Sequence, residues 1–171
     1  LGAARSGNVK MANQALAQLT ALHNKTEKTS AYWAKQIEIQ RLSVMAWIVY
    51  QEGRKIEALK IMQKAAELES STEKHPVTPG EILPARELLA DMLLDMGRYR
   101  EAQTEYETAL KRSPNRFNSL YGAGLAAELG NNKSAAVLYY KKIVKITESV
   151  KTDREQLKHA KLYLSQYGDS S

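Results

Sequence analysis

The sequence predicts an all-α protein, an α-α superhelix in which helical hairpins stack as a right-handed solenoid. A 34-residue unit is clearest at residues 83–116, recurs in the next 34 residues, and is preceded by looser copies. Glycine and proline fall between segments whose apolar residues follow helical spacing. A single hairpin of this kind cannot bury its apolar face alone, so the copies are expected to stack on one another.

Small residues mark the position at which the second helix of each hairpin should pack closely. Ala12, Ala58, Ala102 and Ala136 align there. The last interval equals the 34-residue period, whereas the earlier intervals of 46 and 44 residues each predict an insertion of about ten residues. We therefore predict one solenoid domain over residues 1–171. Its units are expected at about 1–30 (partial), 31–70, 81–116 and 117–150.

Each unit is expected to contain two helices joined by a turn. In the first unit, Gly7 precedes a helix over Val9–His23. In the second, a long helix over Ala31–Glu52 ends at Gly53. The fourth unit differs, because we expect its turn to be shifted to residues 130–132, Gly-Asn-Asn.

Three segments interrupt or end the repeat pattern. Residues 70–80 contain two prolines and a glycine, which predict an inserted loop. Ser113 and Pro114 predict a helix start, with serine at the N-cap and proline at the first helical position. Thr152 and Glu155 fit a capping box that opens a last helix, 152–167. We expect this helix to cap the array.

The third unit carries, in order, Leu89, Ala90, Leu93, Gly97, Tyr99, Ala102, Tyr106, Ala109 and Pro114. This order and spacing resembles the tetratricopeptide repeat, a helix–turn–helix of 34 residues. The segments TEKHPVTPG, LPARELL and SPNRFNSLYGAG also resemble the C-terminal part of a family of larger, uncharacterised bacterial tetratricopeptide-repeat proteins. The resemblance implies missing upstream repeats and supplies no activity. Because the chain opens partway through a repeat, we expect it to be a piece of a longer protein.

Composition limits the class of protein. The 171 residues include 43% apolar and 26% charged residues, which is ordinary for a soluble globular chain. There is no cysteine, so neither disulfides nor thiol chemistry are available. The longest apolar run, Val44–Tyr50, is too short to span a bilayer. The compartment stays open: cytoplasmic, or exported if an upstream region carries a signal.

The net charge of +6 is concentrated late in the chain. The basic residues concerned are Lys141, Lys142, Lys145, Lys151, Arg154, Lys158 and Lys161. A basic face can attract nucleic acid or an anionic membrane. We favour a solvated helical surface, because no RNA-binding signature or aromatic stacking platform accompanies the charge. Weak nucleic-acid binding through these helices is kept as an alternative.

In tetratricopeptide solenoids the first helix of each hairpin lines the concave face. By resemblance, the predicted partner-binding residues are Gln40, Ser43, Trp47, Tyr50, Glu87, Asp91, Asp95, Asn118, Tyr121, Leu125 and Glu128. Glu87, Asp91 and Asp95 are spaced i, i+4, i+8 and would form an acidic stripe. With aromatic residues on either side, such a groove would suit a basic or aromatic peptide. Alternatively, the carboxylates pair with local basic residues such as Arg41 and Arg86.

The sequence offers little for catalysis or for a cofactor. It has no phosphate-binding loop, nucleophile elbow or paired acid–base motif. His23, His75 and His159 are far apart and lack metal-binding spacing, and one helix presents at most two neighbouring carboxylates to an ion. We therefore predict a non-catalytic module that binds an unidentified protein or peptide partner without a metal or cofactor. The alternative is a structural or regulatory segment of a larger protein.

Overall fold

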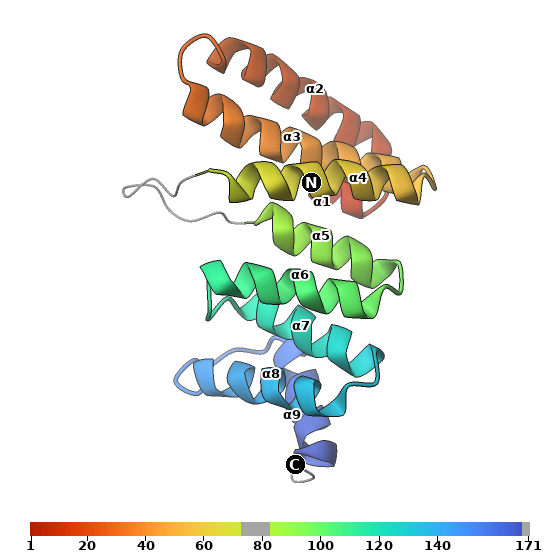
Figure 1. Cartoon of the computed structure of the whole chain (residues 1–171), viewed down its shortest axis with the longest axis vertical. Helices are drawn as coiled ribbons and strands as arrows, with labels where there is room; N and C mark the ends of the chain where they lie inside the picture. Colours follow the sequence, from red (N-terminus) through yellow and green to blue (C-terminus); the bar gives the residue numbers. More distant parts are fainter. Residues whose placement is uncertain (73–82, 169–171) are drawn as a thin grey trace. The chain divides into compact units, whose positions relative to one another are not determined.

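The computed structural model describes residues 1–72 and 83–168, and every regular element within them is an α-helix (Figure 1). The chain divides into two compact units, Leu1–Leu89 and Ala90–Ser171. The first contains α1 (Gly2–Arg5), α2 (Val9–Thr26), α3 (Ala31–Gln51), α4 (Lys55–Ser70) and the beginning of α5 (Ala85–Asp95). The second contains the rest of α5 and then α6 (Tyr99–Arg112), α7 (Phe117–Leu129), α8 (Lys133–Ile146) and α9 (Glu155–Tyr167).

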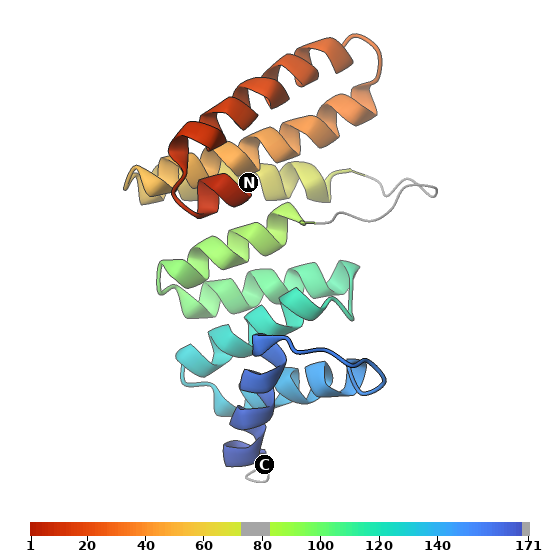
Figure 2. The same cartoon turned by 180° about the vertical axis from the view of Figure 1, so that it is seen from behind.

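Within each unit, helices that follow one another in the chain pack side by side as hairpins (Figures 1 and 2). This arrangement confirms the predicted all-α helical-repeat fold. That the two units behave as one solenoid domain stays a prediction.

Four of the hairpin turns contain a residue with positive φ. These residues are Gly7, Gly53, Gly97 and Asn131, with φ of 78°, 83°, 73° and 59°. Glycine adopts such angles without strain because it lacks a Cβ, and asparagine tolerates them better than most residues. The intervals between the four are 46, 44 and 34 residues, as the alanine alignment predicts. The expected shift of the last turn is wrong, because Asn131 takes the place of glycine in register.

The aligned alanines lie five residues after these turns. Ala12, Ala58, Ala102 and Ala136 all have 0% of their surface exposed. An alanine at a helix contact leaves no side chain beyond Cβ, so the neighbouring helix can approach closely. Their role as close-packing positions in the second helix of each hairpin is therefore consistent with the structure.

The first insertion lengthens two helices instead of forming a separate loop. Helices α2 and α3 have 18 and 21 residues, whereas α6, α7 and α8 have 14, 13 and 14. The extra length is visible in the hairpin of α2 and α3 (Figure 1). The second predicted insertion is the loop at 70–80. Its first residue, Ser70, is the last residue of α4. Residues 73–80, and His75 with them, lie outside the described residues.

In the first unit, a carboxylate ties the end of α4 to the start of α5. Glu69 is buried and accepts hydrogen bonds from the backbone N–H of Ala85 at 2.8 Å and of Arg86 at 3.4 Å. The Arg86 guanidinium donates to Ser70 Oγ at 2.9 Å. A carboxylate at a helix N-terminus satisfies free amides and is favoured by the helix dipole. The end of α4 and the start of α5, which flank the inserted segment, are thus joined by direct hydrogen bonds between these two helices.

The predicted helix start at Ser113 and Pro114 is wrong. Ser113 ends α6, with its N–H bonded to Ala109 O at 3.1 Å. Pro114 lies in a turn that is closed by a 3.1 Å bond from Arg116 N–H to Ser113 O. Proline suits the second position of such a turn because its φ is already fixed there. Helix α7 consequently begins three residues later than predicted, at Phe117.

The predicted capping box at Thr152 is also wrong. Helix α9 begins at Glu155, its N-cap residue is Arg154, and no side chain caps it. The Arg154 guanidinium lies 4.7 Å from the centroid of the Phe117 ring and donates to Asn118 Oδ1 at 3.5 Å. These contacts hold the extended backbone at Arg154 against α7, so the helix cannot start at Thr152.

Two tyrosines fix α7 between α6 and α8 in the second unit. The Tyr106 ring of α6 lies against Gly122, and the Tyr140 ring of α8 lies against Gly124. Both tyrosines are buried. A Cβ at either glycine would overlap the ring, so the close approach depends on glycine. The face of α7 that lies outside these contacts is therefore held in place by the packing of the two tyrosines against the helix.

Candidate partner-binding site

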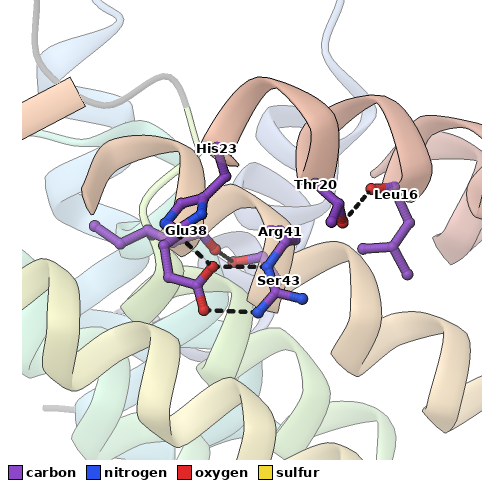
Figure 3. Close-up of polar contacts among 7 residues, drawn as sticks. Leu16, Thr20, His23, Glu38, Arg41 and Ser43 are labelled. Atoms are coloured by element: carbon purple, nitrogen blue, oxygen red, sulfur yellow. Dashed lines mark hydrogen bonds and ion pairs between the residues drawn. The ribbon is translucent and has the colours of Figure 1, made fainter. Parts of the chain in front are cut away.

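The predicted binding positions on α3 are only partly at the surface. Gln40 and Tyr50 are half-buried, whereas Ser43 and Trp47 are each 1% exposed. The Ser43 hydroxyl donates to Ile39 O, one turn earlier in the same helix, at 2.8 Å (Figure 3). The expected exposure of Ser43 and Trp47 is therefore wrong, and these two side chains belong to the packed interior.

Trp47 is covered by the short helix α1. The Arg5 guanidinium lies 4.9 Å from the centroid of the Trp47 ring, and the Tyr50 ring meets the indole edge-on at 5.2 Å. Gln51 Nε2 donates to Arg5 O at 3.2 Å. The Trp47 Nε1–H is buried without a hydrogen-bond partner among the described residues. Trp47 thus serves as a packing residue beneath α1.

The acidic stripe predicted on α5 is divided among different environments. Glu87 is 3% exposed, so its expected exposure is wrong. Asp91 is half-buried and accepts a hydrogen bond from the Tyr106 hydroxyl at 2.6 Å. Only Asp95 lies at the exposed surface. The three carboxylates share one helix but do not form a continuous anionic surface for a ligand.

The predicted residues on α7 meet side chains of α9. The Tyr140 hydroxyl donates to Glu128 Oε2 at 2.7 Å, and His159 Nε2 lies 3.6 Å from Glu128 Oε1. The Tyr121 hydroxyl lies 3.3 Å from His159 Nδ1. Together with the contact between Arg154 and Asn118, these interactions join α7, α8 and α9 in one polar cluster.

The cluster keeps its hydroxyl groups protonated. Burial and the Glu128 carboxylate raise the pKa of Tyr140 above its ordinary value, and the same two causes raise the pKa of Tyr121. The Tyr140 phenol thus remains the donor to Glu128, whereas the direction of the contact between Tyr121 and His159 depends on the imidazole tautomer. His159 was not predicted as a site residue, because its partners on α7 lie 31 and 38 positions earlier in the chain.

Leu125 supplies the apolar part of this face. It is half-buried and lies one turn from Tyr121 on α7. Asn118, at the start of the same helix, is exposed. Tyr121, Leu125 and Glu128 are spaced i, i+4 and i+7, so they share one side of the helix. The structure therefore brings together the four predicted residues of the fourth unit and adds His159 to them.

Arg41 and His23 have a structural partner in the first unit. Arg41 donates to Glu38 with Nε at 2.7 Å and with Nη2 at 2.8 Å, and His23 Nε2 lies 4.0 Å from the same carboxylate (Figure 3). The hydrogen bonds from Arg41 lower the pKa of Glu38, although partial burial opposes them. Arg41 therefore pairs with Glu38, one turn earlier on α3, instead of with the carboxylates of α5.

The basic residues near the C-terminus are exposed, and several of them have intramolecular partners. Lys158 pairs with Glu155 at 2.7 Å, and Lys141 Nζ donates to Gly168 O at 3.0 Å. Lys142 lies over the Tyr139 ring at 5.5 Å from its centroid. In the described part of the chain, no three His, Asp or Glu side chains are grouped as metal ligands. None of its helices combines the length and apolarity needed to span a bilayer.

Comparisons with known proteins agree on the repeat. A family model described as "Tetratricopeptide repeat" matches residues 88–150. Among solved structures, MamA (41-end) from Desulfovibrio magneticus RS-1 is 14% identical, with a TM-score of 0.58 over 90% of this chain and 86% of that one. A tetratricopeptide repeat protein from Parabacteroides merdae is 16% identical, with a TM-score of 0.61 over 92% of this chain and 61% of that one.

A third solved structure, YrrB, is described as a tetratricopeptide-repeat protein with an unusual peptide-binding site. It is 19% identical, with a TM-score of 0.57 over 91% of this chain and 86% of that one. At these identities the likeness concerns the fold. No curated protein matches the chain. The matched family is one of interaction scaffolds, and none of these matches indicates an enzyme family.

Proposed function

We propose that this chain, whose residues 88–150 match the tetratricopeptide-repeat model and whose fold resembles solved repeat proteins, binds a partner segment on the face of α7 that carries Tyr121, Leu125 and Glu128. Repeat proteins of this class serve generally as protein-interaction modules, and their stacked helices form extended binding surfaces. The proposed ligand is a peptide or partner segment with basic and aromatic side chains, bound without catalysis.

The observation that carries this proposal is the combination of partial exposure and rigid support on α7. Tyr121, Leu125 and Glu128 lie on one side of the helix and are each half-buried. The other sides of α7 are fixed by Tyr106 against Gly122 and by Tyr140 against Gly124. Residues that are held in place lose little entropy on binding, which favours affinity.

The chemistry of the face suits the proposed ligand. Leu125 and the Tyr121 ring offer apolar contact to an aromatic side chain, and the charge of Glu128 favours a cation nearby. The corresponding residues on α3 of the first unit are less suited to binding, because Ser43 and Trp47 are buried. YrrB, a protein of this fold, is described as having a peptide-binding site, which supports a peptide ligand in general, although that site belongs to YrrB.

A selection from a displayed library of random peptides would test the proposal, with the whole chain as target. Peptides enriched in basic and aromatic residues are expected. Leu125→Lys should weaken their binding roughly tenfold or more, because it removes an apolar contact near the centre of the face and repels a basic ligand. Leu138→Lys is the matched control, since Leu138 is an exposed leucine on α8, 52% accessible, outside the proposed face.

Circular dichroism and thermal melting would verify that both variants keep the wild-type fold. Selected peptides that bind Leu125→Lys as tightly as wild type would contradict the proposed site. If the selection yields no peptide, the chain is better explained as a structural or regulatory segment of a larger protein. Steeply salt-dependent binding of generic DNA or RNA, unaffected by Leu125→Lys, would favour the nucleic-acid alternative.

A further inference from the structure

A second surface of the Ala90–Ser171 unit lies at the turns, beyond the C-terminal end of the Tyr121 face of α7. Three adjoining hollows of about 460, 430 and 670 Å³ follow the turn between α5 and α6, the turn between α7 and α8, and the end of α9. All three include Asn131 in their lining. Both turns are on the right in Figure 1. We call this region the turn-edge surface and define it by Arg98, Arg100, Leu129, Asn131, Lys133 and Gln166.

The charges of the turn-edge surface leave an excess of cations. Arg98 is neutralised by Glu101, to which it donates with Nε at 2.7 Å and with Nη2 at 2.5 Å. Arg100 and Lys133 are both exposed, and neither has a carboxylate partner in the described residues. Glu101 is the only carboxylate among the described residues that line the hollows. The surface therefore complements an anion.

The remaining lining favours a peptide over a nucleic acid. Leu129 is 45% exposed beside the first hollow and can hold an apolar side chain. The side-chain amides of Asn131 and Gln166 can bond to a peptide backbone. Nucleic acids are bound chiefly through many cations along the phosphate backbone. Among the described residues that line these hollows only Arg100 and Lys133 are cations without a carboxylate partner, and Lys133 Nζ lies 5.0 Å from the centroid of the Tyr167 ring.

We propose that the turn-edge surface binds an acidic, extended peptide segment of a partner protein. Its carboxylates pair with Arg100 and Lys133, and an apolar side chain of the segment packs on Leu129. The site meets the Tyr121 face of α7 at Leu129, which follows Leu125 by one turn, and its two cations come from α6 and α8.

The test uses fluorescence anisotropy with the whole chain and a fluorescein-labelled octapeptide of alternating glutamate and leucine. The comparison probes are the lysine–leucine octapeptide and a thymidine oligonucleotide of the same charge as the acidic peptide. The acidic peptide should bind in preference to both. Arg100→Ala combined with Lys133→Ala should weaken it roughly fivefold, the combined effect of two exposed ion pairs.

The matched control is Lys111→Ala with Lys145→Ala, which removes the same charge from the opposite ends of α6 and α8 and should leave binding unchanged. Leu129→Gln should also weaken the acidic peptide, whereas Leu125→Lys, one turn further from the hollows, should not. Equal loss in both double variants, or equal binding of the oligonucleotide, would overturn the proposal in favour of a general charge effect. Failure of the acidic peptide to bind wild type would overturn it outright and leave the proposal for the Tyr121 face standing.

Discussion

Replacing Gly124 by alanine should destabilise the protein, although alanine is the better helix former. Gly124 lies within α7, and a Cβ there would be 2.6 Å from Cε1 and 2.9 Å from Cδ1 of Tyr140. Carbon atoms pack best at about 3.5–4.0 Å. The Tyr140 ring has 0% exposure, and it contacts the rings of Tyr163 and His159 at centroid distances of 5.2 and 5.6 Å. It therefore has little room to move.

Three contributions set the size of the effect. Overpacking a filled interior costs about 1–3 kcal/mol. A displaced Tyr140 would also strain its 2.7 Å hydrogen bond to Glu128, and such bonds to charged groups contribute about 1.5–3 kcal/mol. The change from glycine to alanine in a helix returns about 1 kcal/mol. With part of the hydrogen bond retained, the net loss should be about 2 kcal/mol, which corresponds to roughly 4–8 °C in melting temperature.

Urea and thermal denaturation followed by circular dichroism would measure this loss. Gly2→Ala is the control, because Gly2 is also helical but has no atom within 4 Å of an added Cβ. The Gly124→Ala substitution should cost much less in a Tyr140→Leu background, since the ring that causes the clash is then absent. A Gly124→Ala protein as stable as wild type would refute the proposed packing of Tyr140 on α7.

Three further substitutions test the hairpins and the first unit. Ala136→Leu should destabilise by about 1–3 kcal/mol in urea denaturation because Ala136 is fully enclosed, and unchanged stability would contradict its role in helix contact. Asn131→Ala should cost about 1 kcal/mol because of the positive φ, whereas Asn131→Gly should not; equal stability of the two would remove that explanation. Glu38→Gln should lose up to about 1 kcal/mol at pH 7. Because the pKa of Glu38 is lowered in the folded state, this stabilisation is present above the ordinary carboxyl pKa and is lost as pH falls through the folded pKa. The difference between Glu38→Gln and wild type should thus shrink below about pH 4 in melting experiments, and a difference that persists there would contradict the pairing with Arg41.

The sequence was a good guide to the hairpins because local steric rules determine them. An alanine at a close helix contact and a glycine at a positive φ are each required by the space around a single residue. The spacing of Ala12, Ala58, Ala102 and Ala136 therefore predicted the positions of the turns. The predicted turn at residues 130–132 includes Asn131, but its register was taken from glycine at position 130, which is the stronger turn signal, although asparagine also tolerates positive φ.

The sequence was a poorer guide to exposure, because exposure depends on neighbours that are distant in the chain. The repeat pattern places Trp47 on an inner face, but Arg5 of α1 lies over its ring. It likewise gives no sign that His159 of α9 would meet Tyr121 and Glu128. The start of α9 was wrongly predicted for a similar reason: Arg154 contacts Phe117 and Asn118 of α7, and the local preference of Thr152 gives no sign of these contacts.

Tyrosines of the second helices bond carboxylates of the predicted acidic groove. Tyr106 of α6 donates its hydroxyl to Asp91, Tyr140 of α8 donates to Glu128, and the distances are 2.6 and 2.7 Å. Carboxylates that the repeat pattern assigns to a ligand therefore satisfy buried phenols, which would otherwise cost free energy without a partner. Substitution of Asp91 would consequently report on folding as much as on binding. Leu125 on α7 and Arg100 at the turns carry no such structural bond, so changes at these two positions can separate recognition from stability.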